Sequence, residues 1–99
     1  MSIYRSKVDA NQPEIVKELR RLGAGVWHTH ALKKFCDLMV VYKGVTAAVE
    51  VKMPGGKQTA GEKVFEADWV ASGGDYYIIE SVEQARIMAG LMAICGPLK

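Results

Sequence analysis

Cysteine is nearly absent from this chain of 99 residues. Only Cys36 and Cys95 occur, the first in an apolar stretch and the second near the end of the sequence. Two isolated cysteines argue against a disulfide framework and against a metal site built from cysteines.

Long apolar runs are missing as well. No segment approaches the ~18 uncharged apolar residues that a membrane span requires, and residues 1–14 carry charges where a secretory signal peptide has its apolar stretch. Repeats, linkers and low-complexity segments are also missing. We therefore expect a cytoplasmic protein with no membrane partner, folded as one domain over residues 1–99.

Net charge is low but unevenly distributed. The formal charge of +2 by itself favours neither the presence nor the absence of a nucleic-acid partner. Residues 1–63 hold eleven Lys and Arg against six Asp and Glu, whereas residues 64–99 hold two against five. A polyanionic partner is expected to approach the first of these segments.

Hydrophobic periodicity and turn residues predict seven elements in the order α-β-β-β-α-β-α. Asn11 is a candidate cap for the first helix, and Thr59 with Glu62 has the form of a capping box. This order predicts an α+β fold in which a small mixed sheet lies between helices. The expected helices span 13–22, 59–72 and 81–94, and the expected strands span 25–32, 35–42, 45–51 and 75–80.

The stretch "AAVEVKMPGG" places charged residues at the end of an apolar strand. Residues two apart in a strand share a face, so Glu50 and Lys52 point the same way while Val49 and Val51 point into a core. If a hairpin turn is centred on Lys43-Gly44, Asp37 lies directly across from Glu50.

Two carboxylates in that position repel each other. At about 5 Å and an effective dielectric constant near 20, the repulsion is about 3 kcal/mol. A divalent cation between Asp37 and Glu50 offsets this cost, and oxygen ligands suit Mg²⁺ or Mn²⁺ rather than zinc. With Lys52 beside the cation, the set suits phosphodiester hydrolysis. A solvated strand end is the competing interpretation, and a slip of one residue in register would remove the pairing.

These residues resemble a known family. Asp37 followed by Glu50-Val51-Lys52 after a hairpin is similar to the core motif of the PD-(D/E)XK nucleases. The run "EVKMPGG" resembles the virus-type replication-repair nuclease (VRR-NUC) domain, and the similarity extends over residues 14–92. The resemblance implies a restriction-endonuclease-like core, cleavage of DNA with Mg²⁺ or Mn²⁺, and, for small members, a homodimer acting on four-way (Holliday) junctions in a bacterial or virus-infected cell.

Site residues follow from the resemblance by position. It implies metal binding by Glu14, Asp37, Glu50 and the main-chain oxygen of Val51, with Asp37, Glu50 and Lys52 catalytic. Glu62 occupies the place where members commonly have a glutamine, which makes it a further candidate. Cys36 replaces the proline of the superfamily motif.

Several of these residues have other interpretations. Glu14 fits a capping box with Asn11, and Glu62 fits one with Thr59. His28 and His30 share a strand face and could hold a transition metal, but no third ligand of the usual kind lies nearby in the sequence, so surface positions are the favoured interpretation. Four lysines near the expected site are candidates for binding DNA phosphates or for a solvated face: Lys33, Lys34, Lys57 and Lys63.

The sequence thus favours a metal-dependent DNA endonuclease, with branched DNA as a candidate substrate. A non-cleaving DNA-binding or assembly module that keeps the nuclease fold is the alternative.

Overall fold

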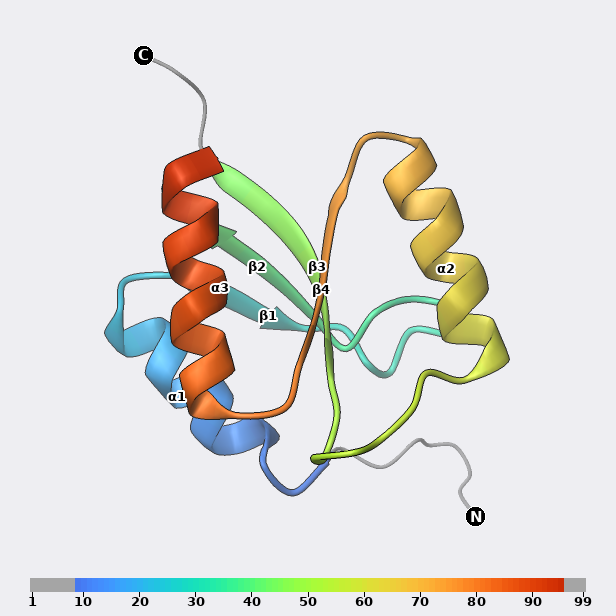
Figure 1. Ribbon diagram of the computed structural model, residues 1–99, viewed down its shortest axis with the longest axis horizontal. Helices are drawn as coiled ribbons and strands as arrows, with labels where there is room; N and C mark the ends of the chain where they lie inside the picture. Colours follow the sequence, from blue (N-terminus) through green and yellow to red (C-terminus); the bar gives the residue numbers. More distant parts are fainter. Residues whose placement is uncertain (1–8, 96–99) are drawn as a thin grey trace.

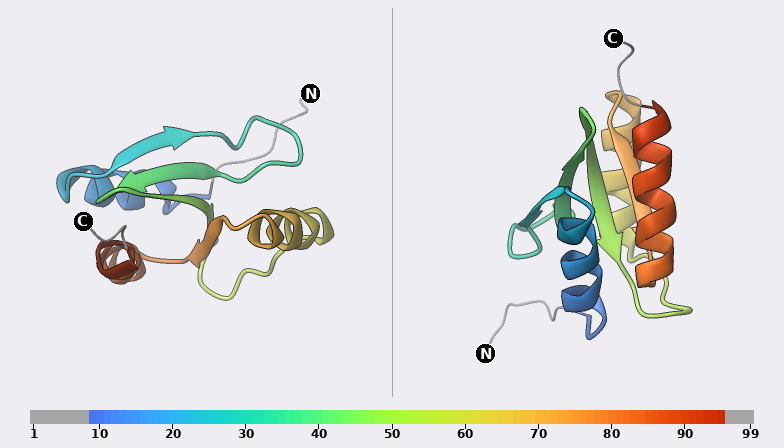
Figure 2. Two further views of the ribbon diagram at one scale, coloured as in Figure 1. Left: turned by 90° about the horizontal axis from the view of Figure 1, so that it is seen from above. Right: turned by 90° about the vertical axis from the view of Figure 1, so that its left-hand side faces the viewer.

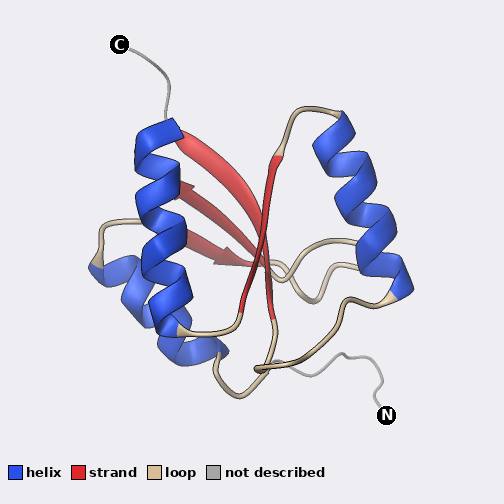
Figure 3. Cartoon of the chain, in the orientation of Figure 1, coloured by secondary structure: helices blue, strands red, loops and turns tan. Residues whose placement is uncertain are grey.

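A computed structural model describes residues 9–95 (Figure 1). The element order confirms the predicted α+β class, with helices on both sides of a four-stranded mixed sheet (Figure 3). Two strands are shorter than predicted: the first ends at His28, four residues early, and the second begins at Leu38, three residues late. In chain order, the elements are α1 (Gln12–Arg21), β1 (Gly25–His28), β2 (Leu38–Tyr42), β3 (Val45–Val51), α2 (Ala60–Ala71), β4 (Asp75–Ile79) and α3 (Val82–Cys95).

The sheet has the order β1-β2-β3-β4. Strands β1, β2 and β3 are antiparallel neighbours, and β4 runs parallel to β3 after the α2 crossover. The hairpin turn is centred on Lys43 and Gly44, whose φ angles of 52° and 83° suit a two-residue turn that follows the strand twist. Leu38 pairs with Val49. The predicted register is therefore confirmed, and Asp37 and Glu50 follow at the next position of the ladder.

The two faces of the sheet have different coverings. Helices α1 and α3 cover one face and enclose the buried core, which includes Leu38, Val49 and Val51. Helix α2 lies on the opposite side of the sheet (Figures 1 and 2). Because strand side chains alternate between faces, Asp37, Glu50 and Lys52 belong to the face toward α2.

Two predicted helix caps have different outcomes. The capping box of α2 is confirmed, since Glu62 N donates to Thr59 Oγ1 at 3.1 Å and Thr59 N donates to Glu62 Oε1 at 2.9 Å. Asn11 precedes α1 but makes no side-chain cap, so that prediction is wrong. Its Nδ2 instead donates to Lys52 O at 3.0 Å and Glu80 O at 2.8 Å. Asn11 therefore ties the start of α1 to the ends of β3 and β4.

Helix α3 begins where the sequence predicts, with Gln84 N donating to Ser81 Oγ at 3.0 Å. The predicted stop at Gly96-Pro97 lies outside the described residues. Within residues 9–95, no helix has the length and apolar character needed to cross a membrane.

Candidate active site

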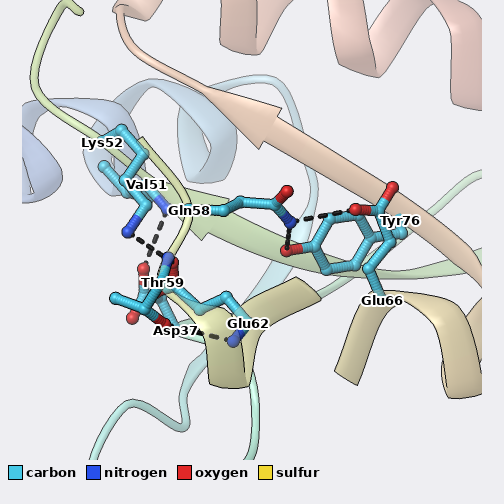
Figure 4. Close-up of polar contacts among 8 residues, drawn as sticks. All are labelled: Asp37, Val51, Lys52, Gln58, Thr59, Glu62, Glu66 and Tyr76. Carbon is cyan, nitrogen blue, oxygen red and sulfur yellow. Dashed lines mark hydrogen bonds and ion pairs between the residues drawn. The ribbon is translucent and has the colours of Figure 1, made fainter. Parts of the chain in front are cut away.

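The candidate active site lies where β3 ends and α2 begins (Figure 4). Asp37 stands immediately before β2, and its Oδ2 accepts a hydrogen bond from Val51 N at 2.9 Å. This contact holds the Asp37 carboxylate against the last residue of β3, next to Glu50. The geometry brings the two acidic side chains of the hairpin together on the face of the sheet toward α2.

Glu50 is a buried carboxylate without a hydrogen-bond partner. Its residue surface is only 1% exposed, and neither of its carboxylate oxygens lies in hydrogen-bond geometry with a described residue, although the Asp37 carboxyl and the Tyr76 hydroxyl lie close enough to affect its ionisation. Burial, together with the negative charges of Asp37 and Glu62, raises the pKa of Glu50 to about 8. Such a group is costly in a folded protein unless something absent from the bare chain binds it.

Asp37 is perturbed in the same direction. Burial raises the pKa of Asp37, while the hydrogen bond from Val51 N partly opposes the rise. Two adjacent carboxylates that both resist ionisation are typical of functional sites, and a cation stabilises both.

The donor set fits a hard cation only in part. Two carboxylates with unsatisfied oxygens suit Mg²⁺ or Mn²⁺, because Mg²⁺ usually keeps several waters and binds only one or two protein carboxylates. Within residues 9–95, no group of three or more His, Cys, Asp or Glu side chains is arranged to hold a metal ion. A site here therefore depends on the Asp37 and Glu50 pair, completed by main-chain oxygen, water or substrate.

Lys52 lies on the same side and pairs with α2. Its Nζ is 2.6 Å from Glu62 Oε1. Partial burial lowers the pKa of Lys52, but the ion pair with Glu62 and the charges of Asp37 and Glu50 outweigh it, so the net shift is upward. Lys52 is thus a positioned cation at neutral pH, which suits stabilisation of negative charge rather than proton abstraction.

Glu62 therefore has two roles in the described structure. It completes the α2 cap, as the structural interpretation predicts, and it also lies at the site through Lys52. A glutamate in this place supplies a negative charge to Lys52 that a glutamine would not.

Glu14 is not part of this group. It lies on the exposed side of the first turn of α1, and no described residue forms a hydrogen bond or ion pair with it. The buried polar residue of that turn is Gln12, whose Nε2 lies 3.3 Å from His28 Nδ1.

The remaining metal-binding candidates do not converge. His28 and His30 join no group of three ligands within the described chain. Cys36, the residue at the superfamily's proline position, is buried, and burial raises the pKa of its thiol. A neutral, buried thiol of this kind is a packing group rather than a ligand.

Two residues near Glu50 were missed by the sequence analysis. The side chain of Gln58 donates through Nε2 to Tyr76 Oη at 3.1 Å and to Glu66 Oε1 at 2.9 Å (Figure 4). Burial raises the pKa of Tyr76, and the negative charge of Glu50 adds to the rise. Tyr76 pairs with Ala48 in the parallel ladder, so it lies on the face of the sheet that carries Glu50.

The four candidate DNA-binding lysines are all exposed, and none forms an ion pair within the described chain. Their charges are therefore available to a polyanion. They are Lys33, Lys34, Lys57 and Lys63.

Comparison with known proteins supports the fold. No family model and no curated protein matches the sequence. A solved structure described as "VRR_NUC domain" superimposes with a TM-score of 0.66 at 19% sequence identity, covering 83% of this chain and 97% of that chain. The chain thus has the fold of a VRR_NUC domain, as the resemblance implied.

Proposed function

We propose that the chain is a single-domain, metal-dependent endodeoxyribonuclease that hydrolyses phosphodiester bonds. The observation that carries this proposal is the buried and unpartnered carboxylate of Glu50, next to Asp37 and on the same sheet face as Lys52. A structural hairpin gains nothing from such a group. The VRR_NUC fold is consistent with the proposal.

Asp37 and Glu50 would hold Mg²⁺ or Mn²⁺, with the main-chain oxygen of Val51 as a further ligand. Bound there, the ion supplies Lewis acidity toward the scissile phosphate and lowers the pKa of water. The resemblance also implies Glu14 as a metal ligand. Because Glu14 is exposed and, within the described chain, forms no contact with the pair, any part it takes would be outside the ligands supplied by Asp37 and Glu50. Loss of such an outer group typically weakens metal affinity about 10-fold or more.

Lys52 would stabilise the negative charge that develops on the phosphate. Its raised pKa keeps the ammonium group charged at neutral pH, and Glu62 holds that group at the site through their ion pair. Removing one electrostatic contact of this kind typically costs about 100-fold or more in rate.

The exposed lysines would position DNA through its phosphates without reading sequence. Lys33 and Lys34 precede Asp37, and Lys57 and Lys63 flank the start of α2, so all four lie near the site in the sequence.

A homodimer would give the enzyme two sites for a branched substrate. Ile87, Leu91 and Ile94 are exposed on α3 at helical spacing, and this apolar stripe is a surface that a second copy would cover. A twofold dimer matches the near-twofold symmetry of a four-way junction.

A non-cleaving DNA-binding module is the competing function, and a cleavage assay separates the two. Labelled four-way junction, flap and plain duplex are incubated with the protein in Mg²⁺ or Mn²⁺. We expect cleavage by the wild type, strong loss in Lys52→Ala and Asp37→Asn, and full activity in Lys17→Ala, a matched change at an exposed lysine of α1. Binding without cleavage in either metal would favour the module.

A further inference from the structure

A cavity lies near the candidate active site. A cavity of about 340 Å³ opens between the segment before β2 and helix α2. This volume is at the lower end of the range for small-molecule pockets. The cavity is lined by Lys34, Gly61, Val64, Phe65 and Asp68.

One wall of the cavity is an aromatic ring held in place by other rings. Phe65 stacks on Trp69 with centroids 5.4 Å apart, and Phe35 meets Phe65 edge-on at 5.3 Å. These contacts fix the ring before anything binds, which lowers the entropic cost of using it as a binding surface. Val64 adds an apolar side chain that is 62% exposed, so the apolar surface here is not covered by the described chain.

The cavity and the candidate active site have no lining residue in common, but they adjoin each other along the chain. Gly61 precedes Glu62, whose carboxylate pairs with Lys52, and Lys34 lies three residues before Asp37. A group in the cavity would therefore lie close to a phosphate held at the site. Lys34 offers a positive charge to an adjacent phosphate, and Asp68 offers a carboxylate that accepts hydrogen bonds.

We propose that this cavity binds an unstacked nucleobase of the DNA substrate, specifically one that carries an exocyclic amino group. The apolar wall formed by Val64 and Phe65 suits a base, because contact between a base and an aromatic side chain tolerates every base and contributes about 1–3 kcal/mol when the two stack. The Asp68 carboxylate favours adenine, cytosine or guanine over thymine, which lacks an amino donor. An apolar side chain of a partner protein is a less suitable occupant, because it would contact the apolar wall but neither Lys34 nor Asp68. This inference rests on the proposed function, since it names a substrate contact of the same site.

The backbone geometry at Gly61 and Lys34 allows two substitutions that change the cavity without straining the fold. A Cβ on Gly61 would meet only Thr59 Oγ1, at 4.0 Å, so the fold has room for a side chain at this position. Because Gly61 lines the cavity, we expect a leucine there to take up part of the cavity volume. Replacing a glycine inside α2 also favours the helix. Lys34 has a φ of 60°, a conformation that glycine adopts without strain, so Lys34→Gly removes the charge without a steric cost to the fold.

The test is an NMR titration of metal-free protein with dAMP, dCMP, dTMP and inorganic phosphate. We expect dAMP and dCMP to shift the amides of the cavity residues and to bind more tightly than dTMP or phosphate. Gly61→Leu should weaken dAMP binding by about 10-fold or more, and Lys34→Gly should weaken it by a smaller factor. Gly73→Ala is unsuitable as a control because of its positive φ, whereas Gly90→Ala, on α3, meets nothing and should bind dAMP like the wild type.

Equal binding of dTMP, shifts scattered outside the cavity, or unchanged affinity in folded Gly61→Leu would overturn the inference. The two proposals can fail separately, because the titration requires no cleavage. Binding of dAMP by a protein that never cuts DNA would leave the base site standing and reject the nuclease. Cleavage of DNA by a protein that does not bind dAMP in the cavity would reject the base site and leave the nuclease proposal standing.

Discussion

Two buried glutamates in this small domain have opposite surroundings. Glu18 of α1 is 8% exposed, and its carboxylate accepts hydrogen bonds from Arg21 and, at 2.7 Å, from Arg86 of α3. Those hydrogen bonds lower the pKa of Glu18 to about 2. Glu50 of β3 is 1% exposed and has no partner for either oxygen, and burial raises its pKa to about 8.

The two glutamates differ in whether the chain itself supplies positively charged partners for the carboxylate. Glu18 has two guanidinium groups from the chain itself and joins α1 to α3, so it serves the fold. Glu50 is deeper and has a second carboxylate beside it. The charge of Lys52 offsets the cost only in part, since the Lys52 ammonium group pairs with Glu62. A buried carboxylate that the fold leaves uncompensated is a functional candidate, whereas a compensated one is a structural group.

The largest expected effect separates the two glutamates by activity. Glu50→Gln should lower the cleavage rate by about 1000-fold, because it removes the carboxylate that would bind the cation. It should not lower the melting temperature at neutral pH, because the raised pKa already leaves the Glu50 carboxyl largely neutral and an amide has nearly the same shape. Glu18→Gln should retain cleavage per folded molecule and lower the melting temperature by a few degrees. Single-turnover cleavage and thermal unfolding measure both effects. A Glu50→Gln protein that cleaves DNA like the wild type would contradict the assignment of Glu50 as a functional residue.

Stabilisation by a divalent cation should depend on Glu50 and not on Glu18. Saturating Mg²⁺ or Mn²⁺ at about pH 8.5 should stabilise the wild type by about 2–3 kcal/mol when the ion is present at 100 times its dissociation constant. Glu18→Gln should show the same gain and Glu50→Gln none, measured by thermal unfolding against NaCl of equal ionic strength. A gain that persists in Glu50→Gln would place the ion elsewhere.

The pH dependence of stability should have opposite signs at the two residues. Because the folded pKa of Glu50 is raised, its contribution to stability falls as pH rises from about 4.5 to about 8. Because the folded pKa of Glu18 is lowered, its contribution is present above about 4.5 and is lost as pH falls toward about 2. Denaturant unfolding should therefore show the gap between Glu50→Gln and wild type widening from about pH 5 to about pH 8.5, at about 1.4 kcal/mol per pKa unit. A constant gap would contradict the shift.

The smallest expected effect concerns Glu62. Glutamine also completes a capping box, so Glu62→Gln should retain the α2 cap while removing the charge that pairs with Lys52. We expect cleavage to fall by less than about 10-fold and stability to remain within about 0.5 kcal/mol. Glu62→Ala should lose the cap as well, at a cost of about 1 kcal/mol. A loss as severe as that of Lys52→Ala would show that Glu62 acts directly at the phosphate.

Much of this site was predictable because its parts are local. The Lys43-Gly44 turn fixes the register of β2 and β3, so the pairing of Asp37 with Glu50 follows from the sequence alone. The α2 cap is equally local, and Thr59 with Glu62 predicts it.

The parts that escaped prediction depend on distant contacts. Tyr76 reaches the face that carries Glu50 only through the parallel pairing of β4 with β3, and no local pattern specifies that register. Asn11 is a residue type common at helix N-caps, yet its side-chain amide donates to main-chain oxygens after β3 and β4. These strand ends come near Asn11 only in the folded chain, so the sequence around Asn11 does not predict the contact. The exposed position of Glu14 likewise depends on how α1 packs.

The protonation state of Glu50 tests the central claim most directly. Its side-chain carboxyl carbon can be followed by NMR across a pH titration, first without divalent ions and then in saturating Mg²⁺, with Glu18 as an internal reference. We predict a pKa of about 8 for Glu50 in the metal-free protein and ionisation at much lower pH when Mg²⁺ is present. An ordinary carboxyl pKa without metal, or a raised pKa that neither Mg²⁺ nor Mn²⁺ changes, would contradict the account.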